Sequence, residues 1–212
     1  GLVGSEMCIR DRSWDNCALL TNSLKPYACC RHTHAADYCA QLLRGEHRLE
    51  PEHITRIVDH TYQVAVNTVD NPEPSTPYGY KFSGQYCTAA MLVYGHLGES
   101  AFTPEATSDP RVRRLMDKIT LVCDPELEAS YQADRNRWAH RLEVTLEDGR
   151  VLTRQVEYPY GDFNNPFTWA YEHEKFHTLA DGVLGPDRVA ALVERLPHLE
   201  ELDDINRLFE GL

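Results

Sequence analysis

The spacing of apolar side chains predicts strands in the middle of the 212-residue chain and helices on both sides. Residues 25–44 begin as an extended Lys-Pro stretch and pass into a helix that we expect to end at Gly45. Pro51 starts a new unit. The segment His53–Val69, rich in Ile, Val, Thr and Tyr, is typical of strand.

The next part of the chain alternates between helix and strand. A proline-rich loop at 71–79 leads into a helix expected over about 84–97 and ended by Gly98. The pair Asp109-Pro110 is a favourable start for a further helix. Its apolar face is formed by Val112, Leu115, Met116 and Ile119. A strand is expected at about 119–123.

The clearest local signal is a hairpin. Two alternating segments, Arg141–Glu147 and Val151–Tyr158, are joined by Asp148-Gly149, a dipeptide typical of tight hairpin turns. Beyond Pro166 the pattern is helical to the end. Helices are expected over about 168–184, 187–196 and 199–211.

This order of elements predicts an α+β fold. A compact α+β unit at 51–160 would be inserted as a lid between residues 13–50 and 161–212, which would form one helical body. The hydrophobic fraction of 42% is sufficient for a core. The formal net charge of −12 argues against general binding of nucleic acid or anionic membrane.

The cysteine pattern indicates reduced thiols. Seven cysteines without regular spacing do not form a disulfide framework, and the sequence shows no secretion signal. We therefore expect a cytoplasmic setting. No stretch approaches the roughly 20 apolar residues that a membrane-spanning helix needs.

The densest group of polar residues lies between Lys25 and Asp37. On a helix starting near Cys29, the side chains of Cys30, His34 and Asp37 would share one face. Such a face could bind zinc, although CC-x-H-x-H lacks the paired spacings of known zinc sites. It could also be a polar helix end with two half-buried cysteines. The third interpretation is an anion and proton-transfer site, in which Lys25 binds a carboxylate and His34 acts as acid or base.

A second candidate site is Tyr80-Lys81-Phe82-Ser83, at the start of the helix expected over 84–97. Helix N-termini attract anions, and Lys81 and Ser83 would add hydrogen-bond donors there. Alternatively, Ser83 is only a helix cap and Phe82 a core residue.

Two charged segments are interpreted as solvated helix faces. One is Arg111–Arg114, and the other is Glu172–Lys175. The second would belong to a helix whose inward face is formed by Trp169, Phe176, Leu179 and Val183.

The segment KPYACCRHTHAAD resembles the K-x-Y-P-x-C-x-x-T-H-x-x-x-D motif of the MmgE/PrpD family. Further landmarks of that family follow in the same order. They are Lys81-Phe82-Ser83-x-x-Tyr86, Asp109-Pro110-x-Val112-x-x-Leu115-Met116, Val144-x-Leu146-x-Asp148-Gly149-Arg150, Gly161-Asp162-x-x-Asn165-Pro166 and Lys175-Phe176. The resemblance covers the chain from about Lys25 onward.

The resemblance implies a helical body with an α+β lid, a homodimer, and chemistry on small polycarboxylates without metal or organic cofactor. The family includes 2-methylcitrate dehydratase and cis-aconitate decarboxylase. By this resemblance Lys25 is the carboxylate anchor and His34 the acid/base or a substrate contact. Cys30 lies where some relatives have a histidine and would line the pocket. Lys81 and Ser83 are the further candidates for substrate binding.

Two departures from the family pattern leave the substrate open. Ala28 replaces the usual proline, and Gly84 stands where an apolar residue is common. Family members are much longer than this chain, so the resemblance implies a C-terminal part with half of the pocket. A non-catalytic lid-and-helix binding module, or a decayed homologue, is the alternative from another functional class.

Residues 1–12, GLVGSEMCIRDR, match nothing in the family pattern. They match the translation of a widely used transposase-based sequencing adapter. We therefore expect the natural sequence to begin near Ser13, with Cys8 not belonging to it.

Overall fold

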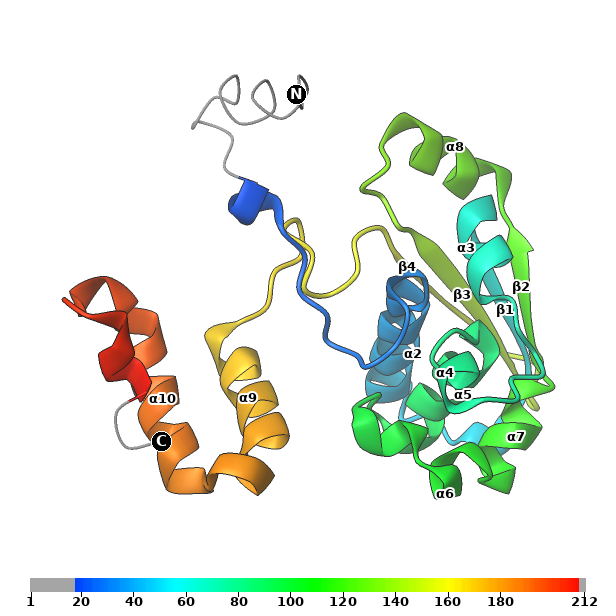
Figure 1. The fold of residues 1–212 in the computed structure, drawn as a ribbon. Coiled ribbons are helices and arrows are strands. Elements are labelled where there is room, and N and C mark those ends of the chain that lie inside the picture. Colours follow the sequence, from blue (N-terminus) through cyan, green and yellow to red (C-terminus); the bar gives the residue numbers. More distant parts are fainter. Residues whose placement is uncertain (1–17, 210–212) are drawn as a thin grey trace, which may run out of the picture. The chain divides into compact units, whose positions relative to one another are not determined.

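The computed structural model describes residues 18–209, and the chain divides between Asn165 and Pro166 into two compact units. Residues 1–12, interpreted above as adapter-derived, lie outside the described range, as does the start of the segment 13–50. The first unit contains a four-stranded sheet and most of the helices (Figure 1). The second consists of helices.

The sheet has the strand order β2-β1-β3-β4. Its strands are β1 (Ile54–Thr61), β2 (Ile119–Cys123), β3 (His140–Leu146) and β4 (Val151–Val156). β1 pairs in parallel with β2, whereas β1–β3 and β3–β4 are antiparallel. The predicted strand at 119–123 and the predicted hairpin are confirmed, with Asp148-Gly149 in the turn between β3 and β4.

Helices and short 3₁₀ segments connect the strands and cover them. The helices of the first unit are α2 (His34–His47), α3 (Gln63–Val69), α4 (Pro77–Tyr80), α5 (Gly84–Tyr94), α6 (Pro104–Thr107), α7 (Pro110–Met116) and α8 (Pro125–Ala133). Its 3₁₀ segments are η1 (Ala18–Thr21), η2 (Arg31–Thr33), η3 (Pro51–His53) and η4 (Glu99–Phe102). The second unit contains α9 (Trp169–Leu184), α10 (Pro186–Arg195), η5 (Leu196–Glu201) and η6 (Ile205–Phe209).

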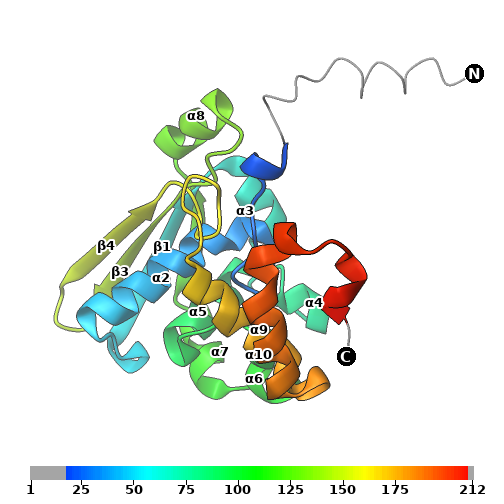
Figure 2. The same ribbon diagram turned by 90° about the vertical axis from the view of Figure 1, so that its left-hand side faces the viewer.

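Helices α2 and α5 pack on one face of the sheet and on each other (Figures 1 and 2). β3 shows the alternation expected for a strand with one covered face, and Leu142 and Val144 are fully buried. They share a single core with Leu43 of α2 and Met91 of α5. Helix α2 therefore lies in the same core as the sheet, although it precedes the boundary that we predicted at residue 50.

The prediction of strand through Val69 was wrong, because β1 ends at Thr61 and helix α3 follows. The β-branched composition of this segment favours strand. However, Ala65 and Val69 are fully buried while Asn67 between them is exposed, a pattern that fits a helix and not the alternation of a strand. Tertiary packing thus overrides local propensity. Helix α8 was not predicted, although Asp124 and Pro125 provide a clear start for it.

Several predicted boundaries also differ. Helix α2 continues through Gly45 and ends where Arg48 adopts a left-handed conformation. Helix α5 ends at Gly95, with φ +79°, and not at Gly98. Asp109 caps α7 as predicted, but Ile119 belongs to β2.

The second unit corrects two further predictions. Residues 199–211 do not form an α-helix within the described part of the chain, where η5 and η6 are found. Trp169, Leu179 and Val183 do not face inward and are 68%, 58% and 83% exposed. A pair of packed helices can cover only one side of each, and the side covered here includes the buried Val189 and Leu192 of α10.

Among the described residues, no helix is both long and apolar enough to span a membrane.

A histidine and an aspartate are buried together in the first unit. His140 Nδ1 lies 2.7 Å from Asp59 Oδ1, and its Nε2 lies 3.0 Å from Thr61 Oγ1. The His140 and Asp59 side chains are 0% and 1% exposed. Because a buried carboxylate without its partner is costly, the two residues stabilise the fold only as a pair.

We expect His140→Ala to lower the free energy of unfolding by about 3–5 kcal/mol, since it leaves Asp59 buried without its partner. The double variant Asp59→Leu/His140→Leu should recover most of this loss, because apolar side chains can replace a buried pair. Urea denaturation followed by circular dichroism measures both. A single variant as stable as the parent would contradict the pairing.

Candidate functional site

Lys25 and His34 meet at one backbone carbonyl. Lys25 Nζ donates to the Cys29 carbonyl oxygen at 3.1 Å, and His34 Nε2 lies 3.3 Å from the same oxygen. Between them, residues 26–29 form bends, Cys30 is extended, and the chain then turns through η2 into α2. The structure therefore brings together the two residues that the sequence singled out for catalysis.

The two residues differ in their environment. Lys25 is exposed, whereas His34 is 0% exposed and packs edge-on against the Tyr27 ring at 5.2 Å. A carbonyl oxygen only accepts hydrogen bonds, so His34 Nε2 is the donor and Nδ1 is the other ring nitrogen. That Nδ1 is buried and has no hydrogen-bond partner among the described residues. The site thus combines a surface cation with an enclosed imidazole.

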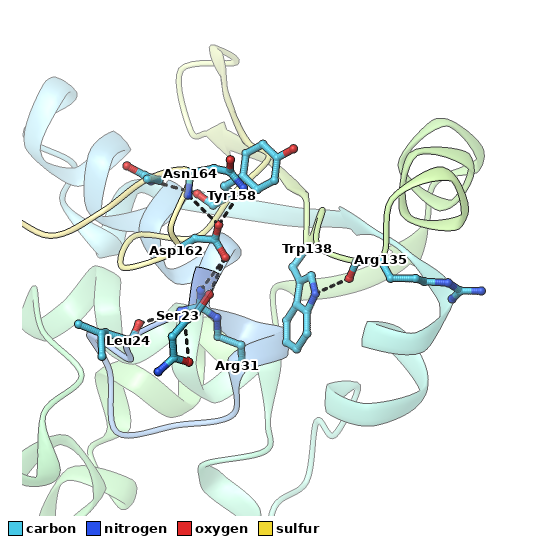
Figure 3. Close-up of polar contacts among 10 residues, drawn as sticks. Ser23, Leu24, Arg31, Arg135, Trp138, Tyr158, Asp162 and Asn164 are labelled. Carbon is cyan, nitrogen blue, oxygen red and sulfur yellow. Dashed lines mark hydrogen bonds and ion pairs between the residues drawn. The ribbon is translucent and has the colours of Figure 1, made fainter. Parts of the chain in front are cut away.

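A buried aspartate fixes the segment that carries Lys25. Asp162 Oδ2 accepts hydrogen bonds from Ser23 Oγ at 2.7 Å and Arg31 Nη2 at 3.3 Å (Figure 3). Its other oxygen accepts from the Asn164 backbone and side chain. The Leu24 amide donates to the Gly161 carbonyl at 2.8 Å. The loop around Asp162 therefore holds both sides of Lys25 in the chain.

Cys30 does not share a helix face with His34 and Asp37, because α2 begins only at His34. Cys30 is in extended conformation, 8% exposed, and its amide donates to the Lys81 carbonyl at 2.8 Å. The expectation of a helix from Cys29 was wrong. The cysteine that contacts Asp37 is Cys29, with Sγ 3.6 Å from Oδ2.

Among the described residues, one group of three side chains could hold a metal ion: Cys29, Asp37 and Cys87 are all buried, and their ligand atoms lie within 4.8 Å of one another. The Thr33 hydroxyl already lies 3.2 Å from Cys29 Sγ and 2.7 Å from Asp37 Oδ2. Burial raises the pKa of both Asp37 and Cys87. The pKa of Cys29 is instead lowered, because the effect of its burial is outweighed by hydrogen bonds with Cys87, His34 and Thr33. With Thr33, the three side chains form a buried hydrogen-bonded cluster.

The candidates at the start of α5 have protein partners. Lys81 Nζ binds Glu99 at 2.9 Å and lies 5.3 Å from the centre of the Phe102 ring. Ser83 is fully buried, caps α5 by accepting from the Tyr86 amide, and donates to the Asn71 carbonyl at 2.6 Å. These contacts support the interpretation of Ser83 as a helix cap.

Next to the Lys25 segment, His32 belongs to an aromatic group that the sequence did not reveal. Its ring stacks on Trp138 with centres 4.5 Å apart, and its Nδ1 lies 2.7 Å from Tyr62 Oη. Burial, with a smaller effect of His140, lowers the pKa of His32 to about 4. The ring is therefore neutral at neutral pH.

Together these contacts define an α+β domain with a cationic group at its surface and a buried histidine behind it. The chain belongs to the MmgE/PrpD family: the family model "MmgE/PrpD C-terminal domain" matches residues 27–198.

Similar proteins include two named 2-methylcitrate dehydratases and a cis-aconitate decarboxylase. The mitochondrial 2-methylcitrate dehydratase of Yarrowia lipolytica is 32% identical over 136 residues, 61% of this chain and 26% of that protein. The Cupriavidus necator 2-methylcitrate dehydratase is 35% identical over 111 residues, 51% of this chain and 23% of that protein. The Aspergillus terreus cis-aconitate decarboxylase is 28% identical over 206 residues, 91% of this chain and 40% of that protein. The matched part of this chain therefore spans well under half the length of each.

Asp162→Ala should loosen the Lys25 segment, because Ser23 and Arg31 lose their acceptor. We expect faster hydrogen exchange at Leu24 and its neighbours, measured by mass spectrometry on the 212-residue chain. Asp148→Ala, at the exposed hairpin turn, is the control and should leave exchange in this segment unchanged. Unchanged exchange in Asp162→Ala would show that the Asp162 contacts do not hold the segment.

The lowered pKa of His32 makes stability depend on pH. Between its ordinary pKa near 6.5 and the folded value of about 4, the unfolded chain binds more protons at this residue than the folded chain. The His32 contribution is therefore complete above pH 6.5 and decreases as the pH falls towards 4. Thermal unfolding between pH 7 and 4 should show a shallower loss of stability in His32→Gln than in the parent. An identical pH dependence would contradict this assignment.

Proposed function

We propose that the chain is the C-terminal part of a lyase or isomerase that acts on small polycarboxylates by proton transfer next to a carboxylate. The observation that carries the proposal is the meeting of Lys25 and His34 at the Cys29 carbonyl, within the motif that marks the family. The names of the relatives support it, since they are dehydratases and a decarboxylase of organic acids.

In this proposal Lys25 binds a substrate carboxylate. Its ammonium group is exposed and is held by the Cys29 carbonyl, which has no charge to neutralise it. A positive charge beside the carboxylate stabilises the negative charge that develops when a neighbouring carbon loses a proton or carbon dioxide. Dehydration, decarboxylation and epimerisation all share this requirement.

His34 supplies acid–base chemistry through Nδ1, which has no hydrogen-bond partner within residues 18–209, while Nε2 is held by the carbonyl. One fixed nitrogen and one free nitrogen give the ring a single orientation and one site for proton exchange. In this proposal Cys30 lines the pocket beside His34. Lys81 and Ser83 are secondary candidates for substrate binding. We propose that the full-length protein is a cytoplasmic homodimer that needs neither metal nor organic cofactor.

Full burial of His34 supports one alternative, a non-catalytic binding module in which the histidine only fixes the Cys29 carbonyl. Substitution can separate these roles. The Nε2 of glutamine can donate to the carbonyl as the imidazole does, but it cannot exchange a proton.

In the full-length parent protein, with a tricarboxylate substrate and no added metal, we expect His34→Gln and His34→Ala each to lower kcat by about 10²–10⁴-fold. Lys25→Met should mainly lower kcat/KM, and Lys25→Arg should restore part of it. Initial rates measure all four variants. If His34→Gln kept parental kcat, the histidine would be structural. If the parent itself showed no turnover but bound the acid, the binding module would be the better description.

A further inference from the structure

Asp37 is a carboxyl group buried without any cation in contact. It lies in the first turn of α2 and is 0% exposed. Its Oδ2 lies 2.7 Å from Thr33 Oγ1 and 3.6 Å from Cys29 Sγ. Its Oδ1 is buried and has no hydrogen-bond partner in the described part of the chain. An ionised carboxylate in such a place would be strongly destabilising.

The two short contacts of the Thr33 hydroxyl are consistent with a proton on Asp37. Its hydroxyl lies 2.9 Å from the Cys30 carbonyl oxygen as well as 2.7 Å from Asp37 Oδ2. A hydroxyl group has one proton and the carbonyl can only accept. If Thr33 donates to Cys30, the second short contact requires a proton from the carboxyl group. A protonated Asp37 satisfies both contacts, whereas a carboxylate leaves one of them without a proton.

The groups that contact Asp37 or act on its charge include no lysine or arginine among the described residues, and His34 acts on it only through Cys29. These groups are Cys29 and Thr33 before α2, Cys87 on α5 and Asp59 on β1. Burial, and next the negative charge on Cys29, raise the pKa of Asp37 well above its usual range. The side chains around Asp37 therefore also favour its protonated form.

We propose that Asp37 is a neutral carboxylic acid and acts as the positioning residue of the Lys25–His34 site. It holds Thr33, Thr33 holds the Cys30 carbonyl, and this fixes the turn whose preceding carbonyl, that of Cys29, receives both Lys25 and His34. The positioning role rests on the proposed function, whereas the protonation state can be tested without it.

If Asp37 is protonated and Asp162 is ionised, substitution by asparagine should affect the Tm differently at the two positions. Asn has the shape and the donor of a protonated Asp37, so Asp37→Asn should change the Tm of the 212-residue chain by less than about 2 °C. Asp162→Asn is the matched control. It removes the charge that Arg31 needs and should lower Tm by about 5 °C or more.

Infrared spectroscopy gives an independent readout. At pH 7 the parent chain should show the carbonyl stretch of a protonated carboxylic acid, above the amide band, and Asp37→Asn should lack it. Absence of this band in the parent, or a loss of Tm in Asp37→Asn as large as in Asp162→Asn, would overturn the protonated state. Neither measurement depends on Asp37→Ala, so both can be made even if that variant does not fold.

In the full-length protein, Asp37→Asn should keep kcat within about threefold and leave the pH profile unchanged, because no ionisation at this residue is used. Asp37→Ala should lower kcat by at least about tenfold while the pH profile keeps its shape. Equal activity of both variants and parent would overturn the positioning role. If the parent has no activity, the proposed function fails, and the infrared band still decides the state of Asp37.

Discussion

The ion pair between Arg31 and Asp162 is the constraint on which the candidate site depends. The two side chains are 13% and 7% exposed, so their attraction is weakly screened by solvent. Arg31 also donates to the Leu24 carbonyl at 3.0 Å. One guanidinium group therefore joins the start of the Lys25 segment, its end and the loop after β4. The hydrogen bonds from Ser23 to Asp162 and from the Leu24 amide to the Gly161 carbonyl support the same link on the exposed Lys25 side of the turn.

On its buried side the same turn is held by a second carboxyl group, Asp37, which has no cation beside it among the described residues. Asp162 faces an arginine and a hydroxyl donor, whereas Asp37 faces thiols, a hydroxyl and another aspartate. Charge suits the first environment and neutrality suits the second. The chain thus uses aspartate both as an ion-pair partner and, by our proposal, as a neutral hydrogen-bond donor. The turn between them, Lys25 to Thr33, carries the carbonyl to which the candidate residues bind.

Local sequence predicted those parts of the structure that depend on neighbouring residues. The Asp148-Gly149 hairpin and the Asp109-Pro110 helix start need only a few adjacent side chains, and both were found. Lys25 and His34 were proposed as site residues from one short segment, and the structure brings both to the Cys29 carbonyl. By contrast, α3 was missed because its burial, not its composition, decides its geometry. Arg31 and Asp162 are 131 residues apart, and His140 and Asp59 are 81 apart. No spacing rule links such residues, so their pairing could only come from the fold.

The placement of Lys25 and His34 also constrains how such a site would work. A histidine exposed beside a lysine would be fully hydrated, and water would compete for its free nitrogen. Here His34 is enclosed, so its Nδ1 can form strong interactions only with a group brought to it. Lys25 remains at the surface, where it can first attract an anion. Lys25 Nζ and His34 Nε2 both lie within hydrogen-bond distance of the Cys29 carbonyl oxygen, which belongs to a planar peptide unit. This shared contact keeps the two nitrogen atoms close together. In the proposed function, a carboxylate bound at Lys25 would be held beside the turn that positions His34, and positioning of this kind is what proton transfer next to a carboxylate requires.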